Sequence, residues 1–430
     1  MKFQTQRPAS WQACIACGNE VVETDARPRC GTCGGLLEVH HRPPEMTAAE
    51  LIQRFTERRG QPGATASGVW RFREIVLPSA DSVVSHPEGN TPLLHRVELD
   101  RWAGVDHLLL KHEGHNPTGS FKDRGMTVGV TQARRIGASA VACASTGNTS
   151  ASLAAYAAQA GLPALVLVPL GGVATGKLAQ SLAYGARTLL VRGDFDDCLR
   201  LVEQASDQLG VYLLNSINPF RVEGQKTIVL ELLQQLSWSP PDWIVLPAGN
   251  LGNTAAFGKA LREAREWGLI SRLPRLAAVQ AAGAAPFARS FADNFAQRHR
   301  VKADTVASAI RIGDPASYDR AVRAIRETDG LVLSSSDEEL LEAKAAIDAS
   351  GVGCEPASAV TLAGIRRLVQ EGKIRSSDQV VAILTGHILK DPGLLLRYHQ
   401  EIDPPPPGAN RPIEIDADLR QVERVLKATA

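Results

Sequence analysis

The sequence has few aromatic residues and almost no surplus of charge of either sign. Phe, Tyr and Trp together make up 5% of the 430 residues, although hydrophobic residues as a whole reach 44%. The apolar content is therefore mainly Ala, Val and Leu, which is typical of buried parallel strands and close-packed helices rather than of antiparallel sandwiches. This composition favours an α/β fold, and the length allows two or three domains at roughly 150 residues per domain.

The lack of net charge excludes a general electrostatic attraction to polyanions. Lys and Arg number 47 and Asp and Glu number 46, which gives a formal net charge of +1. We therefore expect no nucleic acid and no anionic membrane among the partners of this protein. Any anion that it binds must be held by local side chains and backbone N–H groups.

A secretory signal and a membrane span are also absent from the sequence pattern. The first residues, MKFQTQRPASWQAC, never develop an apolar segment, so we expect a cytoplasmic protein. Residues 136–176 contain no Asp, Glu, Lys or Arg, but several Gly and Pro residues interrupt them. We expect this stretch in the protein interior and not in lipid.

Four of the seven cysteines form two Cys-x-x-Cys pairs separated by twelve residues, namely Cys14, Cys17, Cys30 and Cys33. Each pair brings two thiolates to one point, and two such turns complete a tetrahedral, structural zinc site. Disulfides and a ribbon without metal are the alternatives, and an expected cytoplasmic location favours zinc. The pattern predicts a zinc ribbon in residues 1–45.

Predicted strands and helices alternate along the rest of the chain. In the first half we expect strands at residues 108–111, 138–144, 164–168 and 188–191 and helices at 121–136, 149–160, 177–184 and 194–209. In the second half we expect strands at residues 243–246, 275–279 and 380–384 and helices at 254–267 and 358–371. Repeated β-α-β units predict parallel, doubly wound sheets.

We expect these elements to form two α/β domains with a cleft between them. The predicted large domain comprises residues 86–134 and 220–395, and the small domain comprises residues 135–219. Residues 396–430 form a tail with a run of prolines. We expect this tail to dock onto the rest of the chain or to contact a partner subunit.

Two glycine-rich segments are candidates for binding phosphate. Gly171 to Lys177 matches a P-loop until Leu178 replaces the Ser or Thr that would hold Mg²⁺, which excludes nucleotide hydrolysis. Residues 249–254 follow a predicted strand and precede a predicted helix, so that backbone N–H groups and the helix dipole favour a phosphate monoester there. A plain tight turn is the alternative.

Lys122 is the candidate nucleophile. It lies at the expected start of the helix 121–136, where the positive end of the helix dipole lowers the pKa of an amine. A lowered pKa is a route to a nucleophilic lysine, although most lysines are solvated surface charges.

Six segments read together resemble the threonine synthase family of fold-type II pyridoxal-phosphate enzymes, which have a tryptophan synthase β-like fold. They are EGNTPL at 88–93, SFKDRG at 120–125, STGNTS at 145–150, NPFRVEGQ at 218–225, GNLGN at 249–253 and TGHILKDP at 385–392. The resemblance covers about residues 86–395, and the six segments follow one another in the same order as in the family. Several members also carry an N-terminal zinc ribbon.

The resemblance implies how the cofactor, pyridoxal 5'-phosphate, is held. Lys122 would form the internal aldimine, Asn148 would meet the phenolic oxygen and Thr385 the pyridine nitrogen. The phosphate would be cradled by Gly249, Asn250, Leu251, Gly252 and Asn253. The alternatives are a helix cap for Asn148 and a strand end for Thr385. A threonine hydroxyl, unlike an aspartate, does not keep the ring nitrogen permanently protonated, which implies a weaker electron sink.

The substrate that the resemblance implies is O-phospho-L-homoserine, which reacts with water to give L-threonine and phosphate. Lys122 would act as the general base. Ser145, Thr146 and Thr149 would bind the substrate carboxylate at a helix start. For the leaving phosphate, the basic and polar candidates are Arg124, Lys177, Asn218 and Lys111. Ile388 stands where the family would have glycine, so the resemblance does not predict the backbone conformation at this position.

Two alternatives remain. One is another fold-type II enzyme, such as threonine dehydratase, cysteine synthase or cysteate synthase. The other is a non-catalytic sensor built on the same fold, which the presence of Lys122 and the intact phosphate loop argue against. A homodimer is expected in either case, because it is the commonest symmetric assembly.

Overall fold

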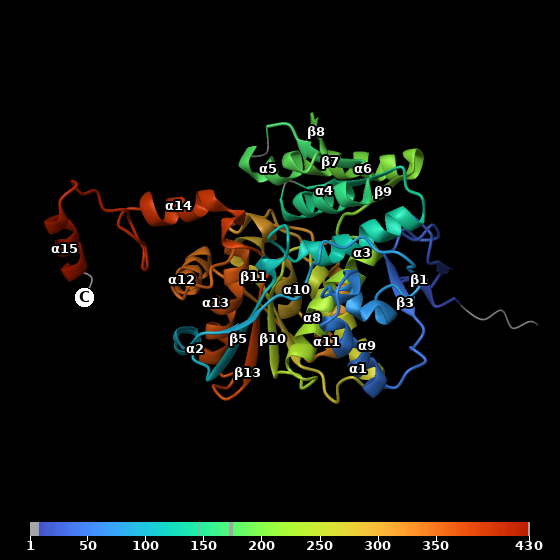
Figure 1. The fold of residues 1–430 in the computed structure, drawn as a ribbon, viewed down its shortest axis with the longest axis horizontal. Coiled ribbons are helices and arrows are strands. Elements are labelled where there is room, and N and C mark those ends of the chain that lie inside the picture. Colours follow the sequence, from blue (N-terminus) through green and yellow to red (C-terminus); the bar gives the residue numbers. More distant parts are fainter. Residues whose placement is uncertain (1–7, 146, 172–174, 429–430) are drawn as a thin grey trace, which may run out of the picture.

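The computed structural model describes residues 8–145, 147–171 and 175–428. The described residues form three β-sheets, with order β12-β11-β10-β13-β5-β4, order β8-β7-β6-β9 and order β2-β1-β3. Figure 1 shows the four-stranded sheet and its helices as a layer above the six-stranded sheet, with the three-stranded sheet at one side. The expected α/β fold with mainly parallel sheets is confirmed.

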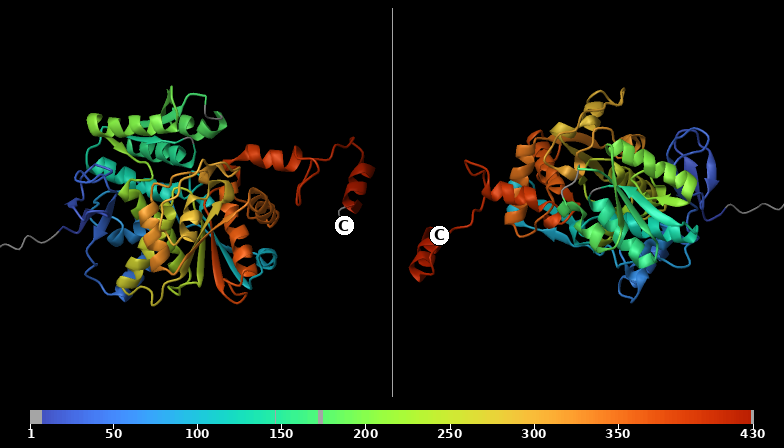
Figure 2. Two further views of the ribbon diagram at one scale, coloured as in Figure 1. Left: turned by 180° about the vertical axis from the view of Figure 1, so that it is seen from behind. Right: turned by 90° about the horizontal axis from the view of Figure 1, so that it is seen from above.

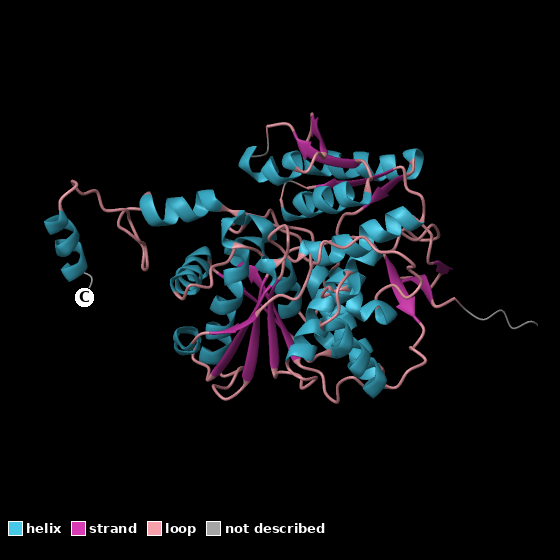
Figure 3. Ribbon diagram, in the orientation of Figure 1, coloured by secondary structure: helices cyan, strands magenta, loops and turns pink. Residues whose placement is uncertain are grey.

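The six-stranded sheet is the centre of the larger layer, and Figure 3 shows its strands as a twisted fan. Its strands are β12 (Leu331–Ser335), β11 (Arg275–Ala281), β10 (Trp243–Pro247), β13 (Gln379–Leu384), β5 (His107–His112) and β4 (Leu93–His95). All neighbours are parallel except β4 and β5. Every residue of β10 is buried, as a parallel strand with helices on both faces requires.

Helices cover both faces of this sheet. One apolar cluster joins it to α2 (Val97–Ala103), α12 (Asp337–Ala349) and α13 (Pro356–Gln370). A second cluster joins it to α3 (Lys122–Arg135), α8 (Thr227–Gln235), α9 (Gly252–Glu266), α10 (Pro286–Ala292) and α11 (Tyr318–Glu327). The helix α7 (Pro219–Gln225) packs closely against α3.

The four-stranded sheet is parallel throughout. Its strands are β8 (Arg187–Val191), β7 (Ala164–Pro169), β6 (Ala140–Ala144) and β9 (Val211–Leu213). The helices α4 (Asn148–Ala160), α5 (Thr175–Ala183) and α6 (Phe195–Leu209) accompany it. Contacts between α3 and α4 bring this layer onto the larger one, as Figure 1 shows.

The three-stranded sheet is antiparallel and contains the Cys-x-x-Cys segments. Its strands are β2 (Glu20–Val22), β1 (Ser10–Cys14) and β3 (Leu37–His41). The helix α1 (Ala48–Arg59) follows it, and Thr47 and Glu50 form a capping box at its start.

A buried cluster of charged side chains joins this sheet to the rest of the protein. Nε2 of His41 on β3 lies 2.7 Å from Oε2 of Glu223 on α7, and Lys226 binds the same carboxylate at 2.5 Å. Lys259 on α9 donates to Glu223 and to the carbonyl oxygen of Val39. Burial opposes ionisation, but the charges of Lys226 and Lys259 hold the pKa of Glu223 well below its ordinary value.

The C-terminal residues extend away from the body of the protein. They contain α14 (Pro392–Gln400) and α15 (Leu419–Ala428), and Figures 1 and 2 show α15 at the far end of an extended arm. Leu419 on α15 is 81% exposed, so this helix does not use that side chain to dock onto the body.

The predicted strands and helices are present, with ends that differ by a few residues. The helix expected at 254–267 begins at Gly252, because glycine and asparagine N–H groups form its first turn. The sequence pattern did not indicate β4, β9 and β12. The strands β4 and β9 have three residues each, and β12 mixes buried and partly buried positions. None of the described helices is long and apolar enough to cross a membrane.

Candidate active site

Lys122 is the first residue of α3, and its Nζ lies 4.0 Å from the centre of the Phe121 ring. The pKa of the Lys122 amine is lowered to about 7, mainly by burial and in addition by the Arg221 guanidinium, whereas the Glu355 carboxylate opposes the shift. The expected lowering of the pKa is confirmed, with burial rather than the helix dipole as its main cause. Much of this amine is unprotonated at neutral pH, as a nucleophile requires.

Backbone pairing places the Lys122 segment beside the end of β13. The N–H of Phe121 donates to the carbonyl oxygen of Thr385 at 3.0 Å, and Ser120 forms an isolated bridge with Gly386. The N–H of His387 donates to the carbonyl oxygen of Gly119 at 2.9 Å. The structure therefore brings together two residues, Lys122 and Thr385, that the sequence analysis assigned to one cofactor.

The loop at residues 249–253 leaves the start of α9 open for an anion. Leu251 adopts a left-handed conformation with φ of 63°, and no side chain caps the helix that begins at Gly252. A backbone hydrogen bond holds the loop in place, because the N–H of Ser317 donates to the carbonyl oxygen of Asn250 at 3.1 Å. The first N–H groups of α9 have no intrahelical partner and suit a phosphate.

Buried polar atoms beside this loop support a phosphate ligand. The hydroxyls of Thr254 and Ser317 and Oδ1 of Asn253 are buried without a hydrogen-bond partner among the described residues. Buried hydroxyls in this state are costly unless a further group binds them. Each hydroxyl has a hydrogen to donate to a further group, so the residues present fit the cofactor's phosphate group.

The helices α3, α7 and α9 meet close to this loop. A Cβ placed on Gly125 in the first turn of α3, or on Gly252 at the start of α9, would in each case lie 3.4 Å from an atom of Gln225 on α7. A Cβ on Gly224 would overlap the carbonyl oxygen of Arg124. The close approach of α3 and α7 thus requires glycine at 224 and brings the Lys122 turn near the phosphate loop.

Asn148 and Thr385 are joined by a carboxylate that the sequence analysis did not identify. Nδ2 of Asn148 donates to Oε2 of Glu355 at 2.8 Å, and Oγ1 of Thr385 donates to Oε1 of Glu355 at 2.9 Å. Asn148 does not cap α4, because the helix already includes it and Gly147 is its N-cap. The sequence feature that could have indicated Glu355 is the pair Glu355-Pro356, which directly precedes an apolar helix.

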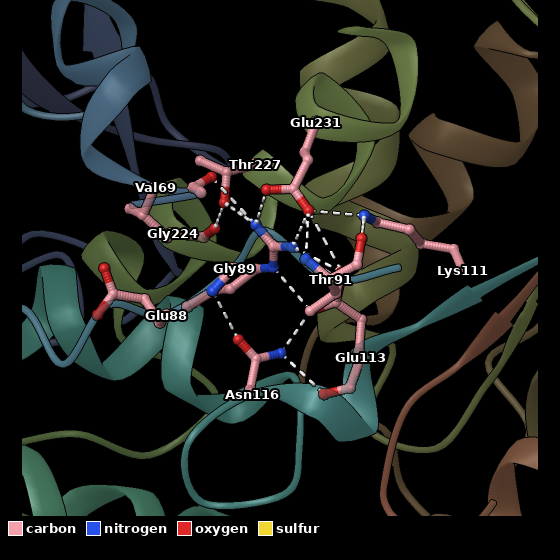
Figure 4. A network of polar contacts seen from close by, with 12 residues as sticks. Val69, Glu88, Gly89, Thr91, Lys111, Glu113, Asn116, Gly224, Thr227 and Glu231 are labelled. Atoms are coloured by element: carbon pink, nitrogen blue, oxygen red, sulfur yellow. Dashed lines mark hydrogen bonds and ion pairs between the residues drawn. The ribbon is translucent and has the colours of Figure 1, made fainter. Parts of the chain in front are cut away.

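Arg124 and Lys111 are not placed to bind a substrate phosphate, which corrects the sequence-based expectation. Arg124 is fully buried, and its Nε and Nη2 bind Glu113 at 2.7 Å and Glu231 at 2.8 Å. Nζ of Lys111 lies 2.6 Å from the same Glu231 carboxylate. Figure 4 shows this network, in which Thr91 also takes part. Both cations are neutralised by carboxylates inside the core.

Asn218 also has a structural role, contrary to the expectation. Its Oδ1 accepts from the N–H groups of Phe220 at 3.0 Å and Arg221 at 3.2 Å, so that it caps α7. Its Nδ2 donates to the carbonyl oxygen of Leu213 at 2.9 Å. The side chain is buried and committed to these bonds, which leaves it no place in a substrate pocket.

The remaining substrate candidates lie at the start of α4 and in α5. Ser145 and Thr149 flank Gly147, the N-cap of α4, where no side chain caps the helix. Its first N–H groups are therefore open to a carboxylate. Thr146 lies outside the described residues, and Lys177 belongs to α5 with its side chain outside the described part.

Lys390 is a cation beside the site that the sequence analysis did not single out. Its Nζ donates to Oε1 of Gln180 on α5 at 2.5 Å, and Gln180 also donates to the carbonyl oxygen of Thr118 at 3.3 Å. Burial lowers the pKa of Lys390, while the carboxylates of Glu355 and Asp123 oppose that shift. The half-buried ammonium thus lies near the acidic groups around Lys122.

The four ribbon cysteines form a separate cluster suited to zinc. Their sulfur atoms all lie within 4.8 Å of one another, and Cys14 and Cys33 are 3.5 Å apart. These distances exceed a disulfide bond, and all four are free thiols. Backbone N–H groups of Thr32 and Cys33 lower the pKa of Cys30 to about 6, which favours the thiolate that a metal needs. At Cys33 the Gly35 N–H acts in the same direction, but hydrogen bonds with Cys17 and Cys14 outweigh it and raise the pKa of this thiol in the absence of metal.

Comparisons with known proteins agree with this geometry. Residues 84–386 match the family model described as "Pyridoxal-phosphate dependent enzyme". The threonine synthase of Methanocaldococcus jannaschii is 43% identical over 426 residues, covering 97% of this chain and 99% of the relative. That of Methanosarcina acetivorans is 43% identical over 415 residues, covering 96% and 98%.

Among solved structures, threonine synthase from Escherichia coli has a TM-score of 0.67 at 20% identity, covering 98% of this chain and 100% of that one. At this identity the likeness concerns the fold. With its nearly full-length similarity to the archaeal enzymes, the chain belongs to the threonine synthase family of pyridoxal-phosphate-dependent enzymes.

Proposed function

We propose that this protein is a threonine synthase, which converts O-phospho-L-homoserine and water to L-threonine and phosphate. The observation that carries the proposal is the Lys122 amine, with a pKa near 7, held beside Thr385 and close to an open helix start. The family membership supports the same reaction.

Pyridoxal 5'-phosphate is the proposed cofactor. Lys122 would hold its aldehyde carbon, and the loop of Gly249, Asn250, Leu251, Gly252 and Asn253 would bind its phosphate through N–H groups. Asn148 and Thr385 would meet its ring. When bound, the cofactor supplies an electron sink for the negative charge that develops on the substrate carbons.

The protein's own residues would then bind the substrate and move its protons. The N–H groups at the start of α4, between Ser145 and Thr149, would bind the substrate carboxylate, with Thr146 in the same loop. The Lys122 amine would remove the proton from Cα and next from Cβ. Phosphate leaves from Cγ, which takes up a proton to become the methyl group. Water then adds at Cβ, and a proton returned to Cα completes L-threonine.

For the leaving phosphate we propose Lys390, with Lys177 retained as a second candidate. The Lys390 ammonium contacts Gln180 and lies near Glu355 and Asp123, so it belongs to the surroundings of Lys122. Arg124, Lys111 and Asn218 are removed from this role by their buried partners.

We further propose a structural Zn²⁺ held by Cys14, Cys17, Cys30 and Cys33. Four thiolates at this spacing match a closed, tetrahedral site, which has no open position for chemistry. The metal would fix the sheet β2-β1-β3, whose strand β3 contacts α7 through His41 and Glu223. Metal analysis of the purified protein tests this, and one zinc per chain is expected.

The two parallel sheets would form separate domains, with residues 86–134 and 220–395 in one and 135–219 in the other. The near-neutral charge of +1 supports a protein without nucleic-acid partners. The free thiols support a cytoplasmic location, and a homodimer is the assembly that we propose.

Product analysis tests the proposed reaction. The purified protein, loaded with pyridoxal phosphate, should release inorganic phosphate from O-phospho-L-homoserine and form an equal amount of L-threonine. A threonine dehydratase would instead release ammonia from L-threonine. Release of ammonia without phosphate would refute the proposal, and the Lys122→Ala variant should release neither.

A further inference from the structure

The guanidinium of Arg320 is buried between the N-terminal sheet and the body of the protein with few partners. Arg320 lies in the first turn of α11 and is 2% exposed. Its Nη2 donates to the carbonyl oxygen of Leu37 on β3, whereas its Nε and Nη1 have no hydrogen-bond partner among the described residues. A buried cation in this state is costly unless a further group neutralises it.

Two other cations at the same interface differ from Arg320, because each is paired with a carboxylate. Nη2 of Arg323 lies 2.5 Å from Oε1 of Glu38 on β3, and Lys259 is paired with Glu223. Within the described part of the chain, Arg320 itself forms no ion pair. The carboxylates at this interface are thus already paired with other cations.

The electrostatic surroundings of Arg320 do not compensate for its burial. The pKa of its guanidinium is lowered to about 10, mainly by burial, and the charges of Glu38 and Glu223 oppose the shift. Arg323 lowers the pKa further, and so does Arg29 of the ribbon. The guanidinium therefore lacks sufficient negative charge in its neighbourhood.

The strand that Arg320 contacts borders the cysteine cluster. Leu37 pairs with Cys14 between β3 and β1, and the Leu37 side chain packs against Cys14 and Cys30 in one buried group. Four thiolates carry more negative charge than one Zn²⁺ ion neutralises, so a loaded site of this kind is an anion. Such an anion would lie on the far side of the strand whose backbone binds Arg320.

We propose that Arg320 is a positioning residue whose buried charge is balanced by the zinc-loaded cysteine cluster, so that metal loading attaches the ribbon to α11. This inference rests on the structural zinc site proposed above. Arg320 is not a metal ligand, and it acts on the site through its charge and through the backbone of Leu37. Groups outside the ligand set commonly support metal binding in this way.

The first turn of α11 also holds the candidate phosphate loop. Ser317, three residues before Arg320, donates its N–H to the carbonyl oxygen of Asn250, and α11 packs along α9. The same turn therefore contacts the ribbon on one side and the loop at residues 249–253 on the other. Metal loading thus fixes a turn that supports the proposed cofactor site.

The variant Arg320→Met tests the role of the charge, because methionine keeps an unbranched side chain without the guanidinium. Zinc is removed from the full-length protein with a chelator, and the affinity for added Zn²⁺ is measured by competition. We expect the dissociation constant of Zn²⁺ to rise by about 10- to 100-fold, the range for residues that support metal ligands.

Arg326→Met is the matched control, because Arg326 lies on the same helix but is exposed and contacts Asn294 and Phe295 instead of the ribbon. Its dissociation constant for Zn²⁺ should differ from that of the wild type by less than about threefold. A loss of affinity in Arg326→Met as large as that in Arg320→Met would overturn the inference.

Thermal melts with and without zinc separate an effect of charge from the loss of a hydrogen bond. Without zinc, Arg320→Met should melt at the same temperature as the wild type or higher, because the variant removes an unpaired buried charge. With zinc, it should melt at a lower temperature than the wild type. A merely structural role, such as the bond to Leu37, would lower both melting temperatures alike, and that result overturns the inference.

The outcomes also separate this inference from the proposed metal site. If the wild type binds no Zn²⁺, the metal site and the inference both fail. If the wild type binds Zn²⁺ and Arg320→Met binds it equally well, only the inference is overturned. Where Arg320→Met does not fold, hydrogen exchange of the wild type decides, because zinc should slow exchange in the first turn of α11 and unchanged exchange overturns the inference.

Discussion

Arg124 and Glu231 form a buried ion pair, with 2.8 Å between Nη2 and Oε1. Arg124 lies two residues after Lys122 on the same helix. The pair joins α3 to α8, and Arg71 and Lys111 bind the same carboxylate at 2.6 Å. Burial opposes ionisation, but the charge of Arg124 and its neighbours holds the pKa of Glu231 well below its ordinary value. The turn that carries Lys122 is thus anchored by charges inside the core.

Replacing Glu231 by glutamine should destabilise the protein strongly. The change would leave Arg71, Lys111 and Arg124 buried with fewer negative partners. The free energy of unfolding should fall by about 3–5 kcal/mol, the usual cost of breaking a buried pair. Urea denaturation followed by circular dichroism measures this loss.

The matched control is Glu327→Gln, which breaks the more exposed pair with Arg262. A surface change of this kind should alter the free energy of unfolding by about 0.5 kcal/mol or less. Equal losses in the two variants would contradict a special role for the buried network.

The Lys122 amine should react with electrophiles at an unusually low pH. In protein free of cofactor, we expect its acylation rate to rise with pH and reach half its maximum near the pKa of about 7. Because burial is the main cause of the low pKa, unfolding should move the midpoint to about 10.4, the ordinary value for lysine.

Competitive labelling followed by peptide mass spectrometry measures both midpoints in the folded and the urea-denatured protein. The same midpoint in both states would show that the fold does not lower this pKa. The Lys122→Arg variant should lose the early-reacting peptide altogether.

Removal of zinc should loosen the N-terminal sheet. The Cys30→Ser variant should hold less than one zinc per chain and melt at a lower temperature, because metal binding contributes directly to the folding of such small sites. Cys198→Ser is the control, since Cys198 is buried in a different apolar cluster. If Cys30→Ser keeps its zinc and Cys198→Ser loses it, the assignment of the metal site is wrong.

The contact between α3 and α7 should not tolerate a methyl group at Gly224. A Cβ there would overlap the carbonyl oxygen of Arg124, and backbone atoms cannot move aside as a flexible side chain can. We expect Gly224→Ala to lower the free energy of unfolding by about 1–3 kcal/mol or more.

Gly60→Ala provides the comparison, because nothing lies within 4 Å of a Cβ at Gly60 and its φ is −95°. Its stability should remain within about 0.5 kcal/mol of the wild type. Thermal melts of both variants measure the difference, and a stable Gly224→Ala would show that α3 and α7 have room between them.

Local patterns in the sequence predicted the elements that bear chemistry. The unbroken apolar run of β10 and the glycines after it indicated a strand followed by a helix start suited to an anion. The structure has the strand and a helix start that no side chain caps. The Cys-x-x-Cys spacing predicted one cluster, because such turns determine the geometry locally. Element order and the parallel sheets followed from the alternation of strands and helices.

Pairing over long distances could not be predicted in this way. Nothing local shows that Arg124 meets Glu231, or that Asn148 meets Glu355 across two layers. For this reason, Arg124 and Lys111 were expected to bind substrate, whereas their charges are neutralised within the core. Similarly, Asn218 was considered as a ligand, although an asparagine before a proline at a helix start is also a common cap.

The proposed chemistry depends most directly on the identity of the lysine that holds the cofactor. Protein loaded with pyridoxal phosphate can be reduced with borohydride, digested and analysed by mass spectrometry for the lysine that carries the pyridoxyl group. We predict a single modified peptide that contains Lys122. Modification of Lys390 or another lysine instead, or of none, would contradict the account.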